Sequence, residues 1–146
     1  MTAKEYLSQA YNIDRHIKRM TERVRLLRDF IEKTSPDLSD IPPGRTQNTC
    51  RLEDIIIKIT GLERAIADCS ERLIETKKMI VEVIKLLDNP TYRLLLELRY
   101  LCYMQWSDIA HVLRYELRYT YKLHKKALQK VDTQRHLIHE IKPVIM

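Results

Sequence analysis

Apolar residues recur at alternating steps of three and four positions in two long stretches of the chain. One stretch runs from Tyr6 to Ile31 and the other from Leu52 to Leu87, where Thr76 is the only polar member of the series. Such spacing is typical of helices that pack along their length as a coiled coil. It predicts helices over residues 2–33 and 51–87. The expected seam between them includes Ile13, Ile17, Met20, Val24, Leu27, Ile59, Leu62, Ile66 and Leu73.

The segment that joins these two helices, residues 34–50, contains Pro36, Pro42, Pro43 and Gly44. These residues interrupt a regular helix, so we expect a loop there and a long antiparallel hairpin over residues 1–88. The second helix is longer and its apolar stripe is broader, so part of the stripe needs a further partner. The C-terminal unit or a second copy of the chain could cover it, and we expect a homodimer. The sequence leaves open whether the hairpin closes within one chain or between two.

The composition indicates an all-α fold. The chain has 146 residues and only two glycines, whereas the hairpins of a sheet need turn residues. After the hairpin, Asn89 is a good helix N-cap and Pro90 suits the first helical position. The helical pattern continues from there, so we expect a separate C-terminal unit over residues 89–146.

The pattern over residues 106–131 has the dimensions of a helix-turn-helix unit. Residues 106–113 make about two helical turns, and the small side chain of Ala110 allows a second helix to cross closely. A tight turn is expected at Arg114 and Tyr115. The second helix is expected from about residue 116 to 131. One side of it should face inward, formed by Thr120, Leu123, Ala127, Leu128 and Val131.

The positive charge of the chain is concentrated in this C-terminal unit. Residues 1–89 hold 16 Lys and Arg against 15 Asp and Glu, whereas residues 90–146 hold 10 against 5. An excess of positive charge favours binding to the phosphates of nucleic acids. We therefore interpret the second helix as the DNA-reading helix of the unit, with double-stranded DNA as the partner. The candidate contact residues are Arg118, Tyr119, Tyr121, Lys122, Lys125, Lys126 and Lys130.

The segment LLLELRYLCYMQWSDIAHVLRYELRYTYKLHKKALQKV, from Leu94 to Val131, resembles the region 4 helix-turn-helix of bacterial sigma factors. The whole chain is similar to a family of small phage and prophage proteins of Gram-positive bacteria, loosely related to the ArpU and RinA type regulators of phage late genes. The resemblance implies a transcriptional regulator that binds DNA and has RNA polymerase as a possible further partner. It also implies that Arg118, Tyr121 and Lys122 read the promoter.

Two residues depart from the sigma-like pattern. Arg114 stands where the turn usually has glycine, and a residue with a side chain costs about 1 kcal/mol or more at positive φ. Gln105 is a weaker helix N-cap than the Ser or Thr often found there. These departures leave two possibilities: the turn has a different geometry, or this chain has lost the ability to read DNA.

Other readings of the same residues remain open. The basic helix could be an ordinary solvated helix, and the heptad helices could serve a protein-interaction module of the host-takeover or inhibitor kind, with a vestigial helix-turn-helix. The sequence has no phosphate-binding glycine loop, zinc-protease motif or nucleophile elbow, so we expect no enzyme activity. We also expect no cofactor, no metal and no small-molecule substrate.

The expected location is the cytoplasm of a bacterial host cell. Cys50, Cys69 and Cys102 are odd in number and have no metal or redox spacing, which indicates free and mostly buried thiols in a reducing compartment. The chain has no apolar run of the ~20 residues that span a bilayer, and its first residues have no signal-peptide core.

Overall fold

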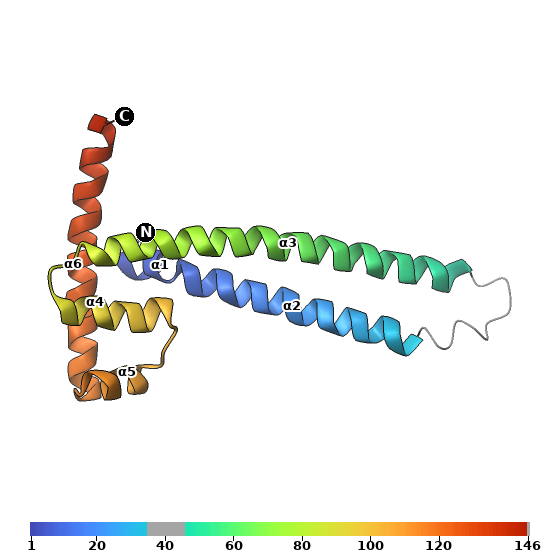
Figure 1. The fold of residues 1–146 in the computed structure, drawn as a ribbon, viewed down its shortest axis with the longest axis horizontal. Coiled ribbons are helices and arrows are strands. Elements are labelled where there is room, and N and C mark those ends of the chain that lie inside the picture. Colours follow the sequence, from blue (N-terminus) through green and yellow to red (C-terminus); the bar gives the residue numbers. More distant parts are fainter. Residues whose placement is uncertain (35–45, 146) are drawn as a thin grey trace. The chain divides into compact units, whose positions relative to one another are not determined.

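The computed structural model describes the backbone of residues 1–34 and 46–145 and the side chains of residues 1–34 and 51–136. Every regular element in these ranges is a helix, which confirms the all-α class (Figure 1). In chain order the elements are α1 (Ala3–Leu7), α2 (Gln9–Thr34), α3 (Thr46–Lys85), α4 (Pro90–Leu96), the π-helix η2 (Glu97–Leu101), α5 (Trp106–Leu113) and α6 (Leu117–Ile145).

The first predicted helix is interrupted at Ser8, which separates α1 from α2. A capping box starts α1: the Thr2 hydroxyl accepts a hydrogen bond from the Glu5 amide (3.2 Å), and the Glu5 carboxylate accepts one from the Thr2 amide (3.1 Å). At the break, the Lys4 carbonyl accepts hydrogen bonds from both the hydroxyl (2.6 Å) and the amide (2.9 Å) of Ser8. Apolar spacing alone does not reveal such a break.

The second long helix begins at Thr46, five residues before the predicted start at Arg51. The expectation that the loop extends to residue 50 was therefore wrong, because adding residues to an existing helix costs far less than starting one. The remainder of the predicted loop, residues 35–45, lies outside the described residues.

The chain divides into two compact units. Unit 2 comprises Ile13–Arg72. Here α2 and α3 run antiparallel as the predicted hairpin, which closes within one chain (Figure 1). Met20, Val24 and Ile59 are buried, and an Arg28–Glu63 ion pair joins the two helices. The other seam residues of this unit are half-buried: Ile13, Ile17, Leu27, Leu62 and Ile66.

Unit 1 comprises Met1–Asn12 and the chain from Leu73 onward. Its core draws Ala3, Leu7 and Ala10 from the N-terminus together with the last turns of α3 and the helices that follow. Arg135 on α6 lies over the ring of Tyr6 (4.4 Å from the guanidinium carbon to the ring centroid). The unit that contains the helix-turn-helix therefore takes in more of the chain than residues 89–146. Its core residues beyond the N-terminus are Ile80, Val83, Ile84, Leu87, Leu95, Leu96, Tyr100, Ile109, Leu123, Ala127 and Val131.

The start of α4 has the predicted cap. The side-chain oxygen of Asn89 accepts hydrogen bonds from the amides of Thr91 (2.9 Å) and Tyr92 (3.4 Å), and Pro90 occupies the first helical position. After α4 the chain widens into the π-helix η2, which closes with a bond from the Cys102 amide to the Glu97 carbonyl (3.1 Å). The extra residue in this turn decides which side chains reach the interior.

The burial of the cysteines and the apolar character of the helices can be compared with the sequence-based expectations. Cys69 is half-buried, but Cys102 is exposed, so the expectation of mostly buried thiols was wrong for Cys102, which follows the π-helix at the surface. The side chain of Cys50 lies outside the described residues. None of the described helices combines the length and the apolar character that a membrane crossing requires.

Candidate functional site

The turn between α5 and α6 has the geometry of a Schellman motif. The Arg114 amide donates to the His111 carbonyl (3.2 Å), and the Tyr115 amide donates to the Ala110 carbonyl (3.0 Å). Arg114 has φ 59° and ψ 40°, the left-handed conformation that this position requires. The turn therefore keeps the conformation usual for glycine although an arginine occupies it. The structure does not show a different turn geometry, and because Arg114 adopts the usual conformation, this departure is not in itself a sign that DNA reading has been lost.

Both helices of the unit begin within one residue of the predicted start, but α6 (Leu117–Ile145) continues beyond the predicted end at residue 131. Helix α5 spans Trp106–Leu113, the predicted range, and Gln105 makes no side-chain capping bond. Ile109 and Ala110 of α5 are buried in the same unit as the inward residues of α6. Thr120 can be fully buried there because its hydroxyl donates to the Glu116 carbonyl (3.0 Å), which satisfies its polar atom.

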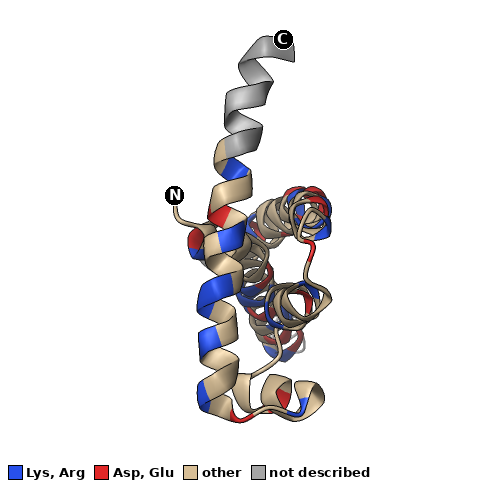
Figure 2. Ribbon diagram, turned by 90° about the vertical axis from the view of Figure 1, so that its left-hand side faces the viewer, with Lys and Arg blue, Asp and Glu red and all other residues tan. Residues whose placement is uncertain are grey.

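The face of α6 opposite its buried stripe carries four of the predicted DNA-contacting side chains, whereas Lys130 lies beside the stripe and lines a second cavity with Asp88 and Tyr92. At about 100° per residue, Arg118, Tyr121, Lys122 and Lys125 lie opposite the buried stripe, and Figure 2 shows basic positions following one another along this helix. Among the described residues, none of its cations has a carboxylate partner within 4.0 Å. All seven predicted residues are exposed: Arg118, Tyr119, Tyr121, Lys122, Lys125, Lys126 and Lys130.

The two predicted tyrosines, which lie on opposite flanks of this face, are each held by another ring. Tyr119 meets Tyr115 edge to face (centroids 4.9 Å apart), and Tyr121 meets Trp106 in the same manner (5.3 Å). Their exposed fractions are 45% and 46%, so each keeps nearly half of its surface for a partner. Such fixed, half-exposed rings lose little conformational entropy on binding.

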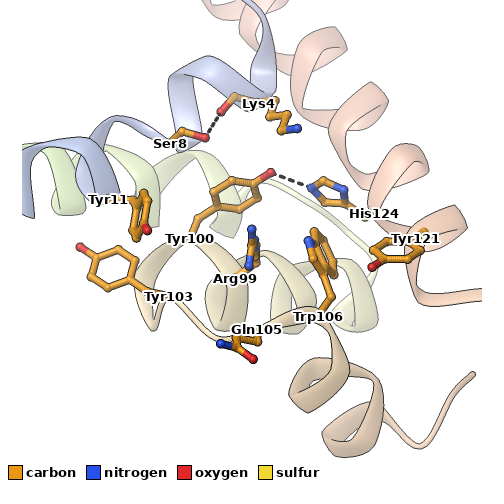
Figure 3. A pocket seen from close by; sticks show the side chains of 10 residues that line it. All are labelled: Lys4, Ser8, Tyr11, Arg99, Tyr100, Tyr103, Gln105, Trp106, Tyr121 and His124. Carbon is orange, nitrogen blue, oxygen red and sulfur yellow. Dashed lines mark hydrogen bonds between the residues drawn. The ribbon is translucent and has the colours of Figure 1, made fainter. Parts of the chain in front are cut away.

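A pocket of about 440 Å³ adjoins this face within unit 1 (Figure 3). Tyr121 and His124 of α6 line it together with Trp106 at the start of α5. The π-helix contributes Arg99 and Tyr100, and the N-terminal segment contributes Lys4 and Tyr11. No local pattern in the sequence indicates this pocket, because its residues come from distant parts of the chain.

Hydrogen bonds and ring contacts fix the walls of the pocket. The Tyr100 hydroxyl lies 2.6 Å from Nε2 of His124, and Trp106 meets the His124 ring at 4.4 Å between centroids. Arg99 donates to the Met104 carbonyl (2.9 Å), and its guanidinium lies over the Trp106 ring at 4.9 Å. The arginine is thus oriented by a backbone carbonyl and by a cation–π contact.

The electrostatic environment of the pocket is positive. Burial lowers the pKa of His124 to about 4, and the positive charges of Lys4 and Arg99 act in the same direction. Burial raises the pKa of Tyr100 to about 12, against the opposing effect of Arg99. At neutral pH the imidazole and the phenol are therefore both uncharged, and the two cations dominate.

Comparison of the chain with protein-family models, with curated proteins and with solved structures finds no match.

Replacing Arg114 by glycine is expected to stabilise the protein. The change removes a side chain from a left-handed position, which is worth about 1 kcal/mol in the free energy of unfolding. Arg114→Val is expected to destabilise it, because a β-branched residue is a steric outlier at positive φ. Urea denaturation of the full chain measures both. A loss of stability in Arg114→Gly would show that Arg114 makes a favourable contact that outweighs the strain.

Acid is expected to destabilise the fold through His124. Its pKa in the folded state is about 4, below the ~6.5 of an unfolded histidine, so between these values the unfolded chain binds the extra proton. The free energy of unfolding therefore falls as the pH drops from about 6.5 to about 4. His124→Gln removes this titration and should flatten the dependence in urea denaturation at pH 7 and pH 5.

The matched control is His111→Gln, which alters an exposed histidine on α5. This variant keeps His124, so the fall in the free energy of unfolding between pH 7 and pH 5 should persist. An unchanged slope in His124→Gln would contradict the buried, neutral state of this imidazole.

Proposed function

We propose that the chain is a DNA-binding transcriptional regulator of the sigma region 4-like type, from a phage or prophage, that reads double-stranded DNA with α6. The observation that carries the proposal is the pairing of a Schellman turn at Arg114 with a face of exposed cations on α6, opposite its buried stripe. A helix-turn-helix needs this combination, since the first helix holds the second with its outer face free for the major groove.

The distribution of side chains along α6 suits a division of labour. Lys125, Lys126 and Lys130 lie further along the helix and would neutralise phosphates, which gives affinity without sequence information. Arg118 and Lys122 lie in its first turns, where recognition helices contact base edges. The half-exposed ring of Tyr121, next to Lys122, would add an apolar contact with thymine methyl groups.

The cellular setting follows from the resemblance to sigma region 4 and belongs to the same proposal. The regulator would act in the cytoplasm of a bacterial host, where phage genes are transcribed, and RNA polymerase would be a further partner. It needs no enzymatic activity and no cofactor for this role.

The double variant Arg118→Ala with Lys122→Ala is expected to lose specific DNA binding. Each contact to a base is worth about 1–3 kcal/mol, so the affinity for a selected duplex should fall at least about 30-fold. The duplex is selected from a random DNA pool with the parent protein, and binding is followed by fluorescence anisotropy. The slope of log K against log salt should also become shallower, by ~0.9 for each phosphate that the variant no longer neutralises.

The matched control is Arg19→Ala with Arg23→Ala, two exposed cations of α2 with the same spacing of four residues. It removes the same charge and should bind the duplex nearly as the parent does. Equal losses in both double variants would mean that only net charge matters. Unchanged binding in Arg118→Ala with Lys122→Ala would show that α6 is not the reading helix.

The exposed apolar side chains of unit 2 favour a second candidate function, a protein-interaction module that uses the heptad helices. Leu26, Phe30, Ile56 and Ile57 are large apolar side chains of the hairpin with exposed fractions between 52% and 68%. Covering each of them is worth about 1 kcal/mol or more. In the proposed regulator a second copy of the chain covers them, because helix-turn-helix proteins commonly bind two half-sites as dimers. Absence of binding to any duplex at low salt would favour the second candidate instead.

The variant Leu26→Ser with Ile57→Ser is expected to convert a dimer into a monomer. Light scattering after size-exclusion chromatography should give the parent about twice the chain mass of 17.5 kDa and the variant that mass alone. The control Arg23→Ser with Lys58→Ser changes exposed polar neighbours on the same two helices and should stay dimeric. A parent that elutes as a monomer at all concentrations would exclude the homodimer.

A further inference from the structure

The pocket of unit 1 combines flat aromatic walls with positive charge. Trp106 and Tyr121 stand together on one side, and the phenol of Tyr100 and the ring of His124 are joined by their hydrogen bond (Figure 3). Lys4 and Arg99 line the same space, and none of the described residues that line it is Asp or Glu. The volume of about 440 Å³ lies within the range of pockets that enclose small organic ligands.

The two cations are not explained by ion pairs within the protein. Among the described residues, neither Lys4 nor Arg99 has a carboxylate within 4.0 Å. Both act on His124 with the same sign, so their charges add at this point. Like charges gathered without a counter-charge destabilise a fold, and such arrangements are concentrated at binding sites.

The backbone is irregular at Arg99, one of the two cations that line the pocket. Arg99 and Tyr100 belong to the π-helix η2, a rare conformation that occurs mostly at functional sites. The residue that follows Cys102, Tyr103, has φ 58°, a second left-handed residue in this unit. The local strain therefore lies beside the aromatic and cationic side chains of the pocket.

We propose that this pocket binds a small molecule that combines a planar ring with an anionic group, as nucleoside monophosphates and aromatic carboxylates do. The ring would lie among Trp106, Tyr100 and Tyr121, and the anion would be held by Lys4 and Arg99. Arg99 is already oriented by the Met104 carbonyl, so it keeps donors free for a phosphate or carboxylate. Because Tyr121 and His124 belong to α6, such a ligand acts as an effector of DNA reading, a consequence that rests on the proposed function.

The single tryptophan of the chain makes the proposal directly measurable. Trp106 lines the pocket, so its fluorescence reports occupancy without a label. The probes are AMP, GMP, CMP, UMP and nicotinate, with adenosine as the uncharged counterpart of AMP. At least one anion should change the Trp106 emission with saturation below about 1 mM, and adenosine should bind at least about fivefold more weakly than AMP if AMP is the ligand. If no probe saturates at millimolar concentration, the proposal is wrong.

Two variants test the role of the cations. Lys4→Gln alters an exposed side chain near the N-terminus and should weaken binding of the anion at least about fivefold. The control Lys78→Gln removes an exposed lysine of α3 in the same unit and should bind as the parent does. Equal affinity in Lys4→Gln and the parent would overturn the assignment of Lys4.

The proposed binding site and its proposed effect on DNA binding can be contradicted independently of each other. The fluorescence titration is done without DNA and therefore depends only on the pocket. The selected duplex is then titrated with and without the saturating anion, and the ligand is expected to change its affinity at least about fivefold. Anion binding with unchanged DNA affinity would keep the site and remove its effector role. Loss of anion binding with intact DNA binding would remove the site and keep the regulator.

Discussion

The buried stripe of α6 is the feature on which the rest of unit 1 depends. Thr120, Leu123, Ala127 and Val131 are each buried along one side of this helix, and α1, α4 and α5 all contact it. Burying a Leu or Val side chain contributes about 1.5–3 kcal/mol, and a rotation of the helix by one residue, about 100°, would expose the stripe. The packing therefore fixes the rotation of α6, and with it the direction of its cations. The basic face of α6 points to the solvent because the apolar face must stay buried.

The same packing explains how the unit tolerates unfavourable backbone at both ends of α5. Tyr103 precedes this helix at φ 58° and Arg114 follows it at φ 59°, and each left-handed residue costs roughly 1–2 kcal/mol. Backbone bonds close both turns: the Met104 amide donates to the Leu98 carbonyl (3.0 Å), and the Tyr115 amide to Ala110 (3.0 Å). Ile109 is fully buried between them, so the burial of α5 offsets the strain of its flanks.

The sequence predicted those parts of the structure that depend on local pattern. The bounds of α5, the Asn89 cap and the inward side of α6 follow from periodicity and capping rules, and the structure agrees with each. The π-helix does not follow from them, because an extra residue in one turn leaves the apolar composition unchanged. It buries Tyr100, while the neighbouring Leu101 is only half-buried. The pocket does not follow from local pattern for a related reason, since only tertiary packing brings Lys4 and Arg99 to the same cavity.

The face of α6 that carries the cations is connected to the pocket by side chains in contact with one another. Arg99 lies over Trp106, and Trp106 meets Tyr121, whose ring reaches the exposed face of α6. Because these two rings are in contact, a ligand that shifts Trp106 in the proposed regulator would also shift Tyr121. In the proposed regulator this coupling is reciprocal: a ligand that changes the affinity for DNA by some factor has its own affinity changed by DNA by the same factor. Tyr121 is then the residue at which the chemistry of the pocket and the recognition of DNA meet.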